Sequence, residues 1–112
     1  MQLLVTILKK ANRMDELIKE LAKAGVKGAT ILDGTGMAES LMNMEDLPLF
    51  GVLRRIMTDE EREASKVMMI ALKDEIVQDV MAIIKAVMGD LTEPNTGIMF
   101  TLPITHFEGI GE

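Results

Sequence analysis

The sequence predicts an α+β fold in which a strand–helix–strand unit occurs twice. Short apolar runs rich in β-branched residues alternate with segments whose apolar residues recur at helical spacing. A long segment separates the two units, and the length of 112 residues suits one domain that spans residues 1–112. Two such units with right-handed crossovers give a ferredoxin-like βαββαβ sandwich, which is a four-stranded antiparallel sheet with two helices on one face.

The first unit begins with Leu3–Leu8, which is apolar on both alternating sets, as is typical of a strand buried on both faces. A helix should follow Asn12, a favourable N-cap, and end at Gly25, which can adopt the left-handed conformation. Lys27–Asp33 is the predicted second strand, and it is closed by residues 34–36 (Gly-Thr-Gly), which can take the positive φ angles of a turn. The apolar residues of the predicted helix are Met14, Leu17, Ile18, Leu21 and Ala22.

The second unit repeats this order. Lys66–Leu72 is the predicted third strand, and Asp74 should cap a helix that ends at Gly89. The last predicted strand is Gly97–Pro103. The apolar residues of the second predicted helix are Ile76, Val77, Val80, Met81, Ile84, Val87 and Met88.

One face of the predicted sheet has no helix to cover it. The strands at residues 3–8, 66–72 and 97–103 are nevertheless apolar on both alternating sets. Soluble monomers rarely expose an apolar patch larger than a few hundred Å². We therefore expect subunits to cover this face for each other in a closed symmetric oligomer.

The segment from about residue 37 to residue 64 is an insert between the two units. Long connections inside compact domains are usually either functional or disordered, and we expect function, including contact with a partner, to concentrate here. Leu49–Met57 has helical spacing and predicts a short amphipathic helix. The adjacent residues Arg54 and Arg55 are candidate contacts for an anionic partner, and the alternative is that they simply face water.

Composition restricts the partners. The chain has no cysteine, so it has neither disulfides nor cysteine-based metal sites. A net charge of −6, without a basic stripe, argues against nucleic acid as a partner. No apolar stretch is long enough for a transmembrane segment, and Met1–Leu8 lacks the features of a secretory signal, so we expect a cytoplasmic protein.

The sequence offers little catalytic chemistry. His106 is the only histidine, and it lies close to Glu108 beyond the last predicted strand. A general base needs a positioned partner and a pocket, and no nucleophile elbow or P-loop motif is present. We therefore expect a protein that is not an enzyme, and we assign it no catalytic or metal-binding residue.

Two glycine-containing pairs are candidate phosphate sites, because backbone N–H groups near glycine can bind anions. They are Gly34 with Gly36, followed by Met37, and Thr96 with Gly97. Turn geometry alone also explains them.

Several segments, in order, resemble the PII nitrogen-regulatory (GlnB-like) family. These are the strand ending in Ile7-Leu8-Lys9, the run Ala24-Gly25-Val26-Lys27-Gly28-Ala29-Thr30-Ile31, the Gly36 turn before a long loop, Thr96-Gly97-Ile98-Met99-Phe100 and the terminal Gly111-Glu112. The resemblance implies a homotrimer that binds adenine nucleotides in clefts between subunits. It also implies that the long loop regulates a partner protein, such as a transporter or an enzyme. Thr30, Gly36 and Gly97 would line the cleft, with Gly34, Met37 and Thr96 beside them.

Some family features are replaced in this chain. Ala38 stands in place of a family glycine, and Ile98 in place of a phosphate-contacting lysine. The C-terminal basic residues are absent from Phe107–Ile110, and the chain has no tyrosine to accept a nucleotidyl group. Each lost charge-assisted contact is worth roughly 1.5–3 kcal/mol, so the identity of the effector stays open and ATP should bind weakly.

Two other functions remain as alternatives. A metal-responsive trimer similar to the CutA proteins would share the fold and bind a divalent metal through His106 and nearby carboxylates. A small enzyme of the dimeric α+β barrel kind is the third hypothesis, although no acid–base pair in the sequence supports it.

Overall fold

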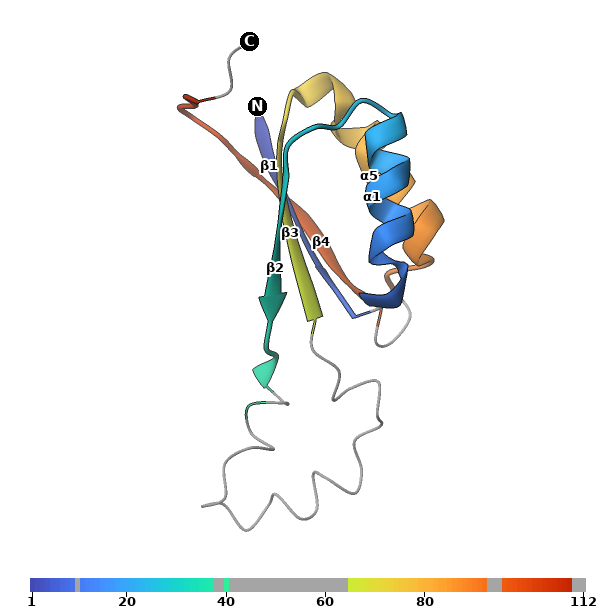
Figure 1. The fold of residues 1–112 in the computed structure, drawn as a ribbon. Helices are drawn as coiled ribbons and strands as arrows, with labels where there is room; N and C mark the ends of the chain where they lie inside the picture. Colours follow the sequence, from blue (N-terminus) through green and yellow to red (C-terminus); the bar gives the residue numbers. More distant parts are fainter. Residues whose placement is uncertain (10, 38–39, 41–64, 93–95, 110–112) are drawn as a thin grey trace, which may run out of the picture.

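The structure is a computed structural model that describes residues 1–9, 11–37, 40, 65–92 and 96–109. One sheet and two helices form two layers (Figure 1). The strands are β1 (Gln2–Leu8), β2 (Ala29–Gly34), β3 (Ser65–Leu72) and β4 (Gly97–Pro103), and the helices are α1 (Met14–Lys23) and α5 (Val77–Met88). Short 3-10 turns, Ala11–Arg13 and Asp74–Ile76, precede the two helices.

The strand order in the sheet is β2-β3-β1-β4, and each neighbouring pair is antiparallel. Each helix connects two strands that are not adjacent, and both helices lie on the same face of the sheet (Figure 1). This arrangement confirms the predicted α+β fold with a four-stranded antiparallel sheet. Among the described residues, no helix is long and apolar enough to span a membrane.

The core lies between the sheet and the two helices. Leu4 and Leu8 of β1, with Met68 and Ile70 of β3, supply the strand side of the core and are almost fully buried. These positions alternate along each strand, as the period of two requires. The helices contribute Met14, Leu17, Leu21, Val77, Val80, Ile84, Val87 and Met88.

The opposite face of the sheet carries no described helix, and its side chains form three apolar rows. By register, the first row is Leu102, Leu3 and Ala71, the second is Phe100, Val5 and Met69, and the third is Ile98, Ile7, Val67 and Leu32. We call these residues the open apolar face. Its outer members are the most exposed: Ile98 is 56% accessible, Leu102 and Leu32 are each 48%, and Phe100 is 40%. The predicted apolar second face therefore exists in the chain.

Three local predictions were wrong. Asn12 lies inside the 3-10 turn, and no side-chain hydrogen bond caps α1. Asp74 does not cap α5, because its carboxylate accepts hydrogen bonds from Gln2 and from the ammonium group of Met1. Gly34 and Gly36 are not among the described glycines with positive φ, and Gly34 is the last residue of β2.

The helix C-termini were predicted correctly. Gly25 (φ 89°) and Gly89 (φ 87°) follow α1 and α5 in the left-handed region. The observed strand boundaries differ from the predicted ones by one or two residues, most clearly at β2, which begins at Ala29 instead of Lys27. The insert helix predicted at 49–57 lies outside the described residues.

Candidate functional site

The candidate site is the end of the sheet where β2 and β1 finish and β3 and β4 begin. Gly34 is paired with Ser65 here, and Leu8 is paired with Gly97. The Lys9 N–H donates to the Thr96 carbonyl at 3.1 Å, which adds one rung to the β1–β4 ladder. We call this region, defined by Gly34, Ser65, Lys9, Thr96 and Gly97, the glycine end of the sheet.

Gly97 is fixed by two constraints at once. Its φ of +143° is a conformation that residues with a side chain rarely adopt. An added Cβ would also lie less than 3.0 Å from the Ile7 carbonyl oxygen and 3.1 Å from the Leu8 Cα. These atoms are backbone, so a side chain here could be accommodated only by separating β4 from β1. The bare backbone of β4 thus approaches β1 very closely at this end.

The other side of the glycine end is the base of the insert. The Ser65 hydroxyl is buried and donates to the Gly34 carbonyl at 3.3 Å. An added Cβ on Gly34 would lie 2.9 Å from the Ser65 Oγ and 3.0 Å from the Val67 Cγ2. One residue along each strand, Lys66 Nζ forms an ion pair with Asp33 Oδ1. These contacts hold the strands together at the points where the insert leaves and rejoins the sheet.

The predicted ligand residues fall into two groups on different strands. On the β2 side, Thr30 is exposed opposite Met69, Gly36 accepts a hydrogen bond from the Ser40 N–H at 3.0 Å, and Met37 is 80% accessible. On the β4 side, Thr96 is only 1% accessible, so it supports the backbone more than it presents a side chain.

Thr30 lies near the start of β2, opposite Met69, and not at the glycine end. The fold places the other members of the two groups at the same end of the sheet but does not bring them together within one chain. β2 and β4 are the two edge strands, with β3 and β1 between them. Three strand spacings of about 4.8 Å separate Gly34 from Gly97 by roughly 14 Å. A site made from both groups therefore needs the β2 edge of one subunit to approach the β4 edge of another.

A family comparison decides which kind of protein carries this arrangement. The profile described as "Nitrogen regulatory protein P-II" matches residues 1–111. The chain belongs to the nitrogen regulatory protein P-II family. Proteins of this family are signalling regulators, so the PII-like chain is a regulatory protein in its general class.

A solved structure gives the fold alone. It is "The crystal structure of a functionally unknown protein from Pediococcus pentosaceus ATCC 25745", which matches with a TM-score of 0.63 and 19% sequence identity. The match covers 97% of this PII-like chain and 96% of the other chain. No curated protein sequence matches this PII-like chain.

Two predicted features beyond the glycine end have different outcomes. Arg54 and Arg55, the predicted partner contacts, lie outside the described residues. His106 does contact Glu108, with 3.3 Å between Nε2 and Oε1, but both side chains are about four-fifths exposed. Within the part of the chain that the structure describes, no group of three or more His, Asp or Glu residues could hold a metal ion.

Sequence reasoning missed Ser65 and the Asp33–Lys66 pair. Both depend on the register between β2 and β3, in which Asp33 is opposite Lys66 and Gly34 is opposite Ser65. A short hairpin turn would fix such a register, but these strands are joined by a long insert. The only local sign of these contacts in the sequence was that polar residues stand at the ends of two apolar runs.

Proposed function

We propose that this PII-like protein is a homotrimeric regulator that binds a small effector between subunits and controls a partner protein through residues 37–64. The single observation that carries this proposal is the open apolar face. Its three rows occupy the helix-free side of the sheet, and four of the side chains are 40% or more exposed in the single chain. Subunits that cover this face for each other would remove it from water.

The same assembly would complete the effector site. Gly34, Gly36 and Met37 stand at one edge of the sheet, and Thr96 and Gly97 stand at the other edge. In a closed ring each β2 edge can meet a neighbour's β4 edge, so that backbone N–H groups from two chains face one ligand. Thr30 is on the face of β2 that would border the same cleft.

We leave the identity of the effector open, but the side chains near the cleft limit how tightly a phosphate group can bind. Ile98 is 56% accessible on the open apolar face, where the family resemblance implies a phosphate-contacting lysine. Lys66, near the β2 side, is already paired with Asp33. We therefore expect adenine nucleotides to bind weakly. The cytoplasmic location is a separate prediction that rests on the sequence.

The test combines mass and binding on the same sample. Light scattering at micromolar concentration should give about three times the chain mass of 12.4 kDa. Calorimetry with ATP and ADP should give dissociation constants well above 1 µM. A monomer would contradict the assembly, and submicromolar ATP binding would contradict the assigned cleft chemistry.

The CutA-like alternative gains no specific observation from the described residues, and titration with divalent metals in the same assay would test it.

A further inference from the structure

Met37 differs from the other methionines that the structure describes, because it is 80% accessible. Three of the others belong to the core and are at most 6% accessible, and these are Met14, Met68 and Met88. Four more are partly covered, namely Met1, Met69, Met81 and Met99. Within the described part of the chain, Met37 is therefore the methionine that water and small solutes reach most freely.

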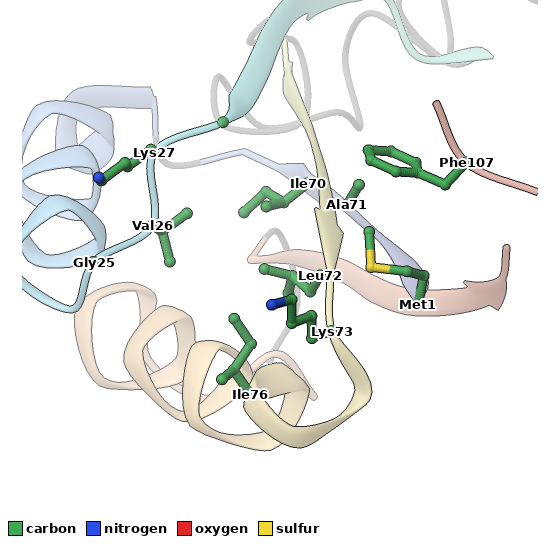
Figure 2. Close-up of a pocket in the computed structure, with 11 residues that line it drawn as sticks. Met1, Gly25, Val26, Lys27, Ile70, Ala71, Leu72, Lys73, Ile76 and Phe107 are labelled. Atoms are coloured by element: carbon green, nitrogen blue, oxygen red, sulfur yellow. The ribbon is translucent and has the colours of Figure 1, made fainter. Parts of the chain in front are cut away.

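Met1 shows how the fold covers a methionine outside the core. Its side chain lines a hollow between residues 25–28 and the end of β3, and Ala71 and Phe107 belong to the same lining (Figure 2). Its backbone is fixed as well, because the Met1 carbonyl accepts a hydrogen bond from the Ile104 N–H at 3.0 Å. Met1 can therefore serve as an internal reference for a partly covered thioether.

Met37 stands at the base of the insert, three residues after Gly34 of the glycine end. It follows Gly36, whose carbonyl accepts a hydrogen bond from the Ser40 N–H at 3.0 Å, so that a helical turn begins at Met37. No atom of the described residues lies within 4 Å of a Cβ built on Gly36, so this point of the chain is open. Met37 is not part of the open apolar face, and subunits that cover that face do not thereby cover Met37.

An accessible thioether can undergo a two-electron oxidation. The methionine sulfur attacks one oxygen of hydrogen peroxide, an S–O bond forms and the O–O bond breaks, and the other oxygen leaves as water after proton transfer. Sulfur is oxidised by two electrons and peroxide is reduced by two. The product, methionine sulfoxide, is polar, and sulfoxide reductases convert it back to the thioether.

We propose that Met37 is a site of reversible oxidation, through which peroxide acts on ligand binding at the glycine end. The inference rests on the proposed function, in which Met37 stands at the β2 edge of the effector cleft. The sulfoxide replaces an apolar group by a dipole whose oxygen is negative, so oxidation should weaken the binding of a phosphate-bearing ligand in this cleft. An oxidant would then be a second input to the regulator besides its effector.

The first experiment measures oxidation residue by residue in the full chain. The protein is treated with hydrogen peroxide for increasing times, digested with trypsin and analysed by mass spectrometry. One tryptic peptide, residues 28–54, carries Met37, Met42 and Met44, so fragment ions must assign each added oxygen. Because burial protects a thioether, Met37 should be oxidised at least about tenfold faster than Met68, with Met1 between the two.

The second experiment measures the consequence for binding, by calorimetry with ATP as the probe. The oxidised parent protein and Met37→Gln, whose side chain is polar and of similar length, should each bind ATP at least about threefold more weakly than the untreated parent. Both sulfoxide reductases together should restore the affinity of the oxidised protein. Met37→Leu is the matched control, because it keeps an apolar side chain without sulfur, and peroxide should not change the ATP affinity of this variant.

Three results would overturn the proposal: oxidation of Met37 as slow as that of Met68, an ATP affinity that oxidation of Met37 does not change, or an equal loss of affinity in peroxide-treated Met37→Leu. Each of them leaves the proposed regulatory function intact, because the mass and the ATP affinity of the untreated parent test that function separately. A parent that binds no ATP would defeat the consequence for binding, while the oxidation rates would still decide whether Met37 is the modified residue. Met37 is exposed, so both substitutions should leave the chain folded, and circular dichroism would verify this.

Discussion

Single residues of the glycine end differ sharply in how much substitution they tolerate, and Gly97 is the extreme case. Gly97→Ala would place a Cβ against the backbone of Ile7 and Leu8 at a φ of +143°. Strain of this kind, with loss of part of the β1–β4 pairing, should lower the free energy of unfolding by about 3 kcal/mol. Urea denaturation at a fixed protein concentration measures the change.

Gly36→Ala is the matched control for this prediction. No atom of the described residues lies within 4 Å of a Cβ built on Gly36, and its φ is outside the left-handed range. Its effect should stay within about 0.5 kcal/mol, as for ordinary surface substitutions. Equal effects of the two substitutions would show that the close approach of β4 to β1 does not constrain Gly97.

At the scale of elements, Asp74 connects the start of β1 to the turn before α5. Hydrogen bonds from the Met1 ammonium group and from Gln2, with the positive charge of that ammonium, hold the pKa of Asp74 below its ordinary value of 3.8. The folded state therefore favours the ionised carboxylate. Its stabilising contribution is complete above the ordinary pKa and is lost as the pH falls through the lowered value.

Asp74→Asn tests this linkage. The variant should be less stable than the parent protein between pH 5 and pH 7, and the difference should shrink below about pH 4 as the parent carboxylate becomes protonated. Thermal unfolding across this pH range provides the measurement, with Asp79→Asn on α5 as a control for removing one negative charge. A stability difference that stays constant down to pH 2 would contradict the assigned contacts.

The elements also show why part of the structure was predictable from the sequence. The strands and helices were found because periods of two and 3.6 are local properties of the chain. Gly25 and Gly89 were found for the same reason, since helix C-termini depend on neighbouring residues. Asp74 was misassigned because its partners, Met1 and Gln2, lie more than seventy residues away in the sequence.

For the candidate site too, features set by neighbouring residues were predictable from the sequence, and contacts between residues far apart in the sequence were not. The resemblance to the PII family pointed to both glycine groups, but neither pattern nor resemblance showed that Gly97 excludes a Cβ by its approach to Ile7. Residues that touch across strands are outside the reach of local patterns.

At the scale of the whole molecule, the open apolar face should decide the assembly. Phe100 stands in its middle row, opposite Val5, and is 40% accessible in the single chain. Phe100→Asp should leave the subunit folded because the side chain is already partly solvated. A carboxylate buried there without a partner in a subunit interface would cost several kcal/mol, and in a symmetric trimer this penalty recurs in every subunit. We therefore expect the variant to be monomeric at micromolar concentration, with a circular dichroism spectrum close to that of the parent.

Ile18→Asp provides the matched control for this assembly prediction. Ile18 is 41% accessible, almost the same as Phe100, but it lies on α1, which covers the other face of the sheet. Its substitution should keep the mass of the assembly measured by light scattering. If both variants keep that mass, the open apolar face is not the interface, and if both lose it, the effect is a general loss of stability. Only dissociation by Phe100→Asp alone agrees with subunits that meet through the helix-free side of the sheet.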